Sequence, residues 1–142
     1  MIPATPTSNI RGTGAPQRSL ASHYDVVIVE DDTMVCDLLA EALAGEGFRV
    51  ATASNGRDAL ELLKRTHASV VVSDLMMPVM SGWELIKAIR AMPELATVPV
   101  LFVTAVVNAH RVPAGPVFLK PLDLDSLVRA VKIHAGSNTS QH

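Results

Sequence analysis

The sequence predicts an α/β fold in which a parallel β-sheet carries helices on both faces. Short apolar segments alternate with segments whose apolar residues recur every three or four positions, as expected for consecutive βαβ units. The short segments are runs of consecutive apolar residues, many of them valine, which is typical of strands buried on both faces. A chain of 142 residues, 49% of them hydrophobic, is large enough to form one such domain with a buried core.

The individual elements follow from this pattern in chain order. Thr33 and Asn55 are suited to cap the first two helices, and Asp123 the last, because their side chains accept hydrogen bonds from main-chain N–H groups. Gly82 precedes the third helix. Strands are expected at residues 26–29, 48–52, 69–73, 98–103 and 117–119.

The connection between the last two strands is unusually short. Only residues 106–116 separate them, and this segment contains Pro113, Gly115 and Pro116. Proline and glycine both disfavour a helix. We therefore expect the helix between these strands, the fourth of a regular alternation, to be short or absent.

The composition argues against several classes of function. The net charge of −2 does not indicate the basic surface that nucleic-acid binding requires. No apolar stretch is long enough for membrane insertion. The single cysteine, Cys36, rules out an internal disulfide, and the five histidines show no metal-ligand spacing. We expect no residues that bind an organic cofactor. We expect a disordered N-terminal tail over residues 1–23, one folded domain over 24–135 and a polar C-terminal tail over 136–142.

Charged side chains follow three of the predicted strands at the point where each strand ends. Glu30, Asp31 and Asp32 follow the first strand, Asp74 the third and Lys120 the fifth. Ligands of open α/β sheets bind beyond the carboxyl ends of the strands, so these carboxylates are expected to meet there if the first and third strands are neighbours. Like charges about 5 Å apart repel by roughly 3 kcal/mol at an effective dielectric constant near 20. Such a cluster calls for a cation or for protonation, and its hard oxygen ligands favour Mg²⁺ as the cation.

A carboxylate beside a bound metal ion is suited to phosphoryl chemistry. It can attack phosphorus as a nucleophile and form an acyl phosphate. Thr104, at the end of the fourth strand, supplies a hydroxyl for the new phosphoryl group, and Lys120 supplies a positive charge for its oxygens. Each of these residues taken singly is also compatible with an ordinary loop or surface position, and it is their common order at strand ends that indicates a site.

These motifs together resemble the receiver domain of two-component response regulators, over residues 25 to about 134. The resemblance implies a flavodoxin-like (βα)5 fold with a doubly wound parallel sheet of strand order 2-1-3-4-5. It is carried by Glu30-Asp31, Asp74 followed by Pro78 and Gly82, Thr104-Ala105, and Lys120-Pro121.

The resemblance also implies a role for each matching residue. Asp74 would be the phosphoacceptor and a ligand of Mg²⁺. Asp31 would bind the ion directly, Glu30 mainly through water, and the main-chain carbonyl of Met76 would complete the protein ligands. Thr104 and Lys120 would contact the phosphoryl group.

The same resemblance implies the partners. The phosphoryl donor would be a histidine kinase or a histidine phosphotransfer protein, and phosphorylation would switch contacts with a downstream protein target. We expect a cytoplasmic single-domain receiver without a catalytic activity on other substrates, limited to its own phosphorylation and dephosphorylation. Two departures from the family pattern are the short segment 106–116 and Val117, which stands where receivers usually carry a switch aromatic.

Three alternatives remain open from the sequence. A pseudo-receiver would be an interaction module that no longer accepts phosphate, and the short segment 106–116 is compatible with it. A receiver fragment of a hybrid histidine kinase is a further possibility, because a short connection of this kind would also fit there. A haloacid-dehalogenase-like phosphatase would also use an aspartyl phosphate, but it would need a second carboxylate two residues after Asp74, where this chain has Met76.

Overall fold

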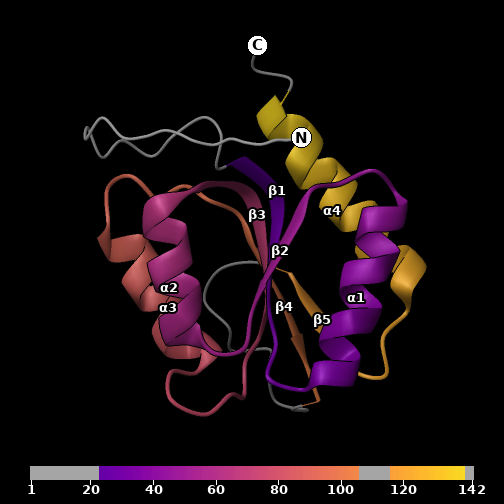
Figure 1. Cartoon of the computed structure of the whole chain (residues 1–142), viewed down its shortest axis with the longest axis horizontal. Coiled ribbons are helices and arrows are strands. Elements are labelled where there is room, and N and C mark those ends of the chain that lie inside the picture. The colour runs from indigo at the N-terminus through magenta and orange to yellow at the C-terminus, as the bar shows by residue number, and fades with distance from the viewer. Residues whose placement is uncertain (1–22, 106–115, 140–142) are drawn as a thin grey trace, which may run out of the picture.

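The computed structural model describes residues 23–105 and 116–139 of the chain (Figure 1). Five strands form one sheet in the order β2-β1-β3-β4-β5, and every neighbouring pair is parallel. This order confirms the predicted flavodoxin-like fold. The strands are β1 (His23–Val29), β2 (Val50–Ala53), β3 (His67–Asp74), β4 (Val100–Thr104) and β5 (Val117–Leu119).

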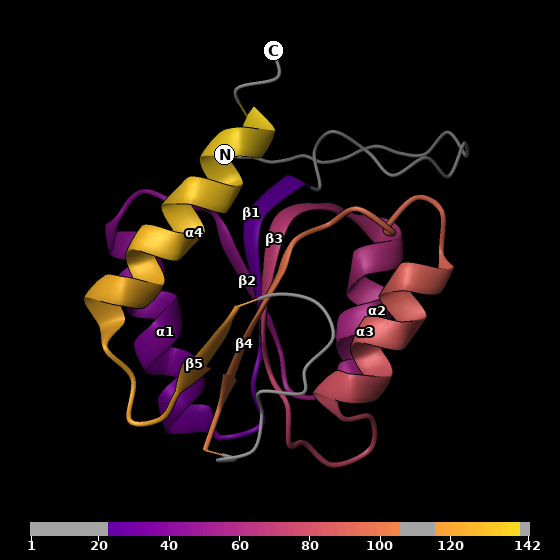
Figure 2. The ribbon, with the colours of Figure 1, turned by 180° about the vertical axis from the view of Figure 1, so that it is seen from behind.

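The helices form one layer on each face of the sheet. Helices α1 (Thr33–Gly45) and α4 (Leu124–Thr139) cover one face, and α2 (Gly56–Arg65) and α3 (Gly82–Ala91) cover the other. Figure 1 shows the two layers, and Figure 2 shows them from behind. Among the described residues, none of the helices has the length and apolar character that crossing a membrane requires.

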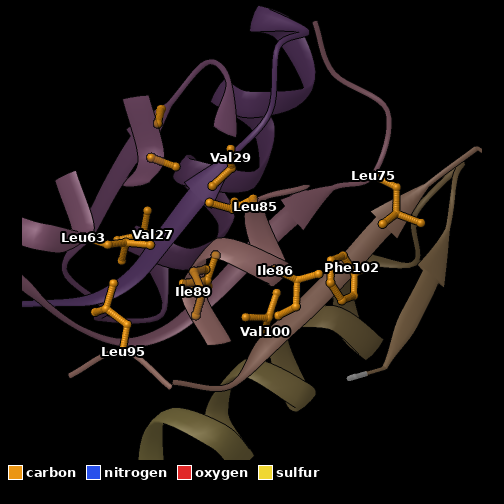
Figure 3. Packing of buried hydrophobic residues seen from close by; sticks show 13 residues of the cluster. Val27, Val29, Leu63, Leu75, Leu85, Ile86, Ile89, Leu95, Val100 and Phe102 are labelled. Atoms are coloured by element: carbon orange, nitrogen blue, oxygen red, sulfur yellow. The ribbon is translucent and has the colours of Figure 1, made fainter. Parts of the chain in front are cut away.

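Successive side chains of the central strands fill two hydrophobic clusters, one on each face of the sheet. In β1, Val27 and Val29 pack with residues of α2 and α3, whereas Val26 and Ile28 pack with residues of α1 and α4. Figure 3 shows the first cluster, to which β4 contributes Phe102. Burial on both faces explains why these strands are continuous runs of apolar residues.

The predicted elements are found, with shifts at their ends. β1 and β3 begin earlier than expected because His23 and His67 pair with each other in the sheet. β4 begins at Val100, just after Pro99, which has no N–H group for the ladder. Helix α4 continues to Thr139, past residue 135, where we placed the end of the folded domain. The predicted loss of the fourth helix concerns residues 106–115, which lie outside the described residues.

The cap of the first helix was assigned to the wrong residue. Asp32, not Thr33, caps α1, because the Asp32 carboxylate accepts hydrogen bonds from the N–H groups of Met34 and Val35. Thr33 is the first helical residue. The cap predicted for α2 is confirmed, since the Asn55 side chain accepts a hydrogen bond of 2.8 Å from the N–H group of Asp58.

The loop between β3 and α3 is held closely at both ends. The Gly82 N–H group donates to the Leu75 carbonyl at 2.9 Å, and a Cβ atom at Gly82 would collide with the Asp74 carbonyl oxygen. Just before Gly82, the Met80 carbonyl accepts a hydrogen bond of 3.1 Å from the N–H group of Gly56, the first residue of α2. The position of Asp74 is therefore tied to the starts of two helices.

Val79, in the middle of this loop, has a strained backbone. Its φ angle is 72°, and the Met80 N–H group donates to the Pro78 carbonyl at 2.8 Å, which makes a γ-turn of the rare kind with a positive central φ. A β-branched residue is poorly suited to this region. Strain of this kind costs on the order of 1–3 kcal/mol.

We expect Val79→Gly to stabilise the protein by about 1 kcal/mol, because relief of the strain exceeds the roughly 0.5–1 kcal/mol of added backbone entropy in the unfolded chain. Val79 is 63% exposed, so little hydrophobic burial is lost. Urea unfolding measures the difference. Val79→Ala is the matched control: it keeps a Cβ atom and should gain less. Equal stability of the two variants would contradict the strain argument.

Candidate functional site

Three carboxylates from two neighbouring strands meet at the C-terminal edge of the sheet. Glu30 and Asp31 directly follow β1, and Asp74 is the last residue of β3. These strands pair in parallel, with Val29 beside Ser73. One carboxylate oxygen from each of Glu30, Asp31 and Asp74 lies within 4.8 Å of the others. The structure thus brings together the three carboxylates that the sequence predicted would meet.

The three carboxylates differ in their exposure to solvent. Glu30 is 2% exposed and Asp74 is 5% exposed, whereas Asp31 is exposed. Glu30 is fixed because its N–H group donates to the Ala53 carbonyl at 3.0 Å and its carboxylate accepts from the Asp32 N–H group at 3.2 Å. Asp32 therefore has two structural roles that sequence reasoning missed: its carboxylate caps α1, and its N–H group orients Glu30.

Lys120 links the two buried carboxylates. Its Nζ atom donates to Asp74 Oδ2 at 3.0 Å and to Glu30 Oε1 at 3.1 Å. It follows β5, and its N–H group donates to the Thr104 carbonyl at 2.8 Å, just before a cis peptide bond to Pro121. Partial burial alone would lower the pKa of Lys120, but the hydrogen bonds to Asp74 and Glu30 outweigh it and raise that pKa. The lysine is thus held in its charged form against the carboxylates.

Burial dominates the ionisation of Glu30. Desolvation raises the pKa of its carboxyl group from 4.5 to about 7, and the charge of Asp74 acts in the same direction. The hydrogen bonds from Lys120 and from the Asp32 N–H group lower the pKa but do not compensate. The burial of Glu30 therefore outweighs the stabilisation of its charged form by Lys120.

Thr104 and Met76 complete the predicted site. Thr104 is fully buried at the end of β4, one residue beyond Val103, which is the register partner of Asp74. The Met76 N–H group donates to Asp74 Oδ1 at 3.1 Å, while its side chain is 57% exposed. Both residues thus lie beside Asp74, whereas the ligand role of the Met76 carbonyl stays a prediction.

The donor set fits a small divalent cation. The groups that meet are carboxylate oxygens, which Mg²⁺ prefers, and one oxygen of each lies within 4.8 Å of the others. Glu30 and Asp31 also line a cavity of about 500 Å³ between α1 and α2. This cavity gives the carboxylates an opening to solvent on one side.

The pKa of Glu30 predicts an unusual pH dependence of stability in the metal-free protein. Because the folded chain binds this proton more tightly than the unfolded chain, the contribution of Glu30 is fully present below about pH 4.5. It is lost as the pH rises through about 7. By urea unfolding with EDTA, we expect the stability of Glu30→Gln to exceed that of the wild type by on the order of 2 kcal/mol at pH 8 and to match it near pH 4.

Glu41→Gln, at an exposed position of α1, is the control for the loss of one negative charge. It should change the stability little and equally at both pH values. A Glu30→Gln effect of the same size at pH 4 and pH 8 would contradict the titration of Glu30 as the cause.

Comparison with known proteins agrees with this geometry. The sequence profile of the response regulator receiver domain matches residues 26–132. A probable transcriptional regulator, ycf29, of Porphyra purpurea is 32% identical over 84% of this chain, and the chain spans 61% of that protein. An uncharacterized 14.6 kDa protein of Leptolyngbya boryana is 37% identical over 78% of this chain and 89% of its own length.

A solved structure shows the same arrangement of elements. The chemotaxis response regulator CheY4 of Vibrio cholerae is 28% identical and superposes with a TM-score of 0.71, over 77% of this chain and 96% of its own. The profile match runs from within β1 into α4. It includes the three carboxylates Glu30, Asp31 and Asp74 and also Lys120. The chain therefore belongs to the family of response regulator receiver domains.

Proposed function

We propose that the chain is the phosphoacceptor of a two-component relay and that Asp74 receives the phosphoryl group in a Mg²⁺-dependent reaction. The observation that carries the proposal is the environment of Asp74. Its carboxylate is buried at the edge of the sheet, beside two other carboxylates and in contact with Lys120. A carboxylate that only ended a strand would not need this set of neighbours.

Receiver domains bind Mg²⁺ in an acidic pocket, and the acidic cluster of this chain supplies suitable ligands. Asp31 and Asp74 would bind the ion directly, Glu30 mainly through water, and the Met76 carbonyl would complete the protein ligands. The bound ion would supply positive charge that offsets the carboxylates and the phosphoryl oxygens. The exposed position of Asp31 leaves access to the cluster from solvent.

The transfer itself would be a nucleophilic substitution at phosphorus. A carboxylate oxygen of Asp74 forms the new O–P bond while the N–P bond of a phosphohistidine on the donor protein breaks. The bonding electrons stay on the imidazole nitrogen, which then takes a proton from solvent. Lys120, now bound to Asp74 Oδ2, would move to a phosphoryl oxygen, and the Thr104 hydroxyl would bind another. These movements would give the phosphorylated state a different surface.

Receiver domains interact with kinases and with downstream targets. For this chain we propose a histidine kinase or a histidine phosphotransfer protein as donor and a protein as target, in the cytoplasm. The expectation that no nucleic acid is bound stays a prediction, because the relative from Porphyra purpurea is a probable transcriptional regulator longer than this chain. Receiver domains are in general signal transducers and not enzymes.

Incubation with acetyl phosphate as a small phosphoryl donor tests the phosphoacceptor. With Mg²⁺ present, intact-mass spectrometry should show the added mass of one phosphoryl group on the wild type, and EDTA should abolish it. Asp74→Asn should show no added mass, whereas Asp125→Asn, at an exposed position of α4, should behave as the wild type. A folded wild-type protein that takes up no phosphoryl group with Mg²⁺ would favour the pseudo-receiver.

The lifetime of the acyl phosphate should depend on Met76. Hydrolysis needs a water molecule in line with the phosphorus, and the apolar Met76 side chain beside Asp74 cannot orient it by hydrogen bonds. We expect Met76→Gln to speed the loss of the phosphoryl mass by about tenfold, which corresponds to about 1.4 kcal/mol of activation free energy. Met76→Leu is the matched control and should decay like the wild type. Equal decay of the Gln and Leu variants would exclude this role.

A further inference from the structure

Two histidines lie side by side at the edge of the sheet opposite to the carboxylates. His23 is the first residue of β1 and His67 the first of β3, and the two are register partners in the parallel pair. Register partners on neighbouring parallel strands point to the same face, and the strands lie about 4.8 Å apart. The two imidazoles therefore project from adjacent positions, although they are far apart in the sequence.

The ring of His23 is already oriented by a carboxylate. Its Nε2 atom lies 3.3 Å from Asp25 Oδ1, and the other oxygen, Asp25 Oδ2, accepts a hydrogen bond of 2.8 Å from the Arg49 N–H group. Because an ionised carboxylate only accepts, a neutral His23 must carry its proton on Nε2 and keep the lone pair on Nδ1. A carboxylate that fixes one ring nitrogen and leaves the other free is the usual setting of a metal-ligating histidine.

Both side chains are accessible. The side chain of His23 is 42% exposed, and His67 is exposed. Among the described residues, only the carboxylate cluster places three potential ligand atoms within 4.8 Å of one another, so a metal ion at the histidines would have two protein ligands and complete its shell with water. Imidazole nitrogen suits Zn²⁺, whereas Mg²⁺ prefers oxygen.

We infer that His23 and His67 form a Zn²⁺ site, with Asp25 as the carboxylate that positions His23. The site would join the N-terminal ends of β1 and β3, about 20 Å along the strands from the carboxylates at their C-terminal ends. The pair β1 and β3 would thus hold Mg²⁺ at its C-terminal end and Zn²⁺ at its N-terminal end. Bound Zn²⁺ would also stabilise the fold, because the unfolded chain does not keep the two histidines together.

Isothermal titration of the full chain with Zn²⁺ tests this site. Saturating Mg²⁺ is present throughout to occupy the carboxylate cluster. The wild type should bind one Zn²⁺ per chain, and its midpoint of thermal unfolding should rise with Zn²⁺. His23→Ala and His67→Ala should each lose this binding. Asp25→Asn should bind about ten- to a hundredfold more weakly, as is usual when the carboxylate behind a ligating histidine is removed.

Matched variants separate this site from other Zn²⁺ ligands of the chain. His134→Ala on α4 and Cys36→Ser on α1 should bind as the wild type does. If circular dichroism shows that His67→Ala folds poorly, His67→Gln takes its place, because glutamine keeps a polar side chain of similar size. This variant should also lose Zn²⁺ binding. Unchanged binding after loss of both His23 and His67 would overturn the proposal, as would absence of saturable binding. One Zn²⁺ per two chains, with a Zn²⁺-dependent dimer in sedimentation, would overturn a site within one chain.

Discussion

The parallel pairing of β1 with β3 is the constraint on which the rest of the molecule depends. Each strand contributes side chains to both hydrophobic clusters, so the pair is buried by helices on either side. Because the strands run in the same direction, residues that follow them emerge at one edge, and Glu30 and Asp31 come to lie beside Asp74. Residues that begin them emerge at the other edge, where His23 meets His67. One pairing therefore determines what gathers at each end of the sheet.

The pairing creates an electrostatic problem that the remaining strands solve only in part. A buried Glu30 next to Asp74 is unfavourable when both are ionised, and β5 delivers Lys120 to lie against both. Its main chain is attached to the end of β4 through the Thr104 carbonyl. Burial keeps the pKa of Glu30 at about 7 despite the lysine, so ionisation of Glu30 near neutral pH costs the folded protein stability. The burial of Glu30 and its ionisation are therefore in opposition at this edge of the sheet.

Sequence reasoning succeeded where strand direction alone decides the outcome and failed where local competition decides it. The strand order was implied by the resemblance to receiver domains. Once β1 and β3 are neighbours, the meeting of Glu30, Asp31 and Asp74 follows from parallel strands that end in charged residues. The cap of α1 was wrong because Asp32 and Thr33 are adjacent and both are good acceptors. The γ-turn at Val79 has no sequence signal, since valine disfavours a positive φ. The His23–His67 pair depends on the register of two strands, which spacing along the chain does not reveal.

The two glycine contacts of the β3–α3 loop have a consequence for engineering the molecule. A side chain at Gly82 would strike the main chain of Asp74, and one at Gly56 would strike Met80, so this loop has a fixed length and path. Exposed side chains such as those of Met76 and Val79 can change size without striking the main chain of the loop. The turn after α1 is different, because nothing lies within 4 Å of a Cβ atom built at Gly45 or Gly47, although the φ angle of 96° at Gly47 favours glycine there. Peptide tags or fluorescent-protein insertions should therefore be tolerated at that turn, whereas the β3–α3 loop should accept none.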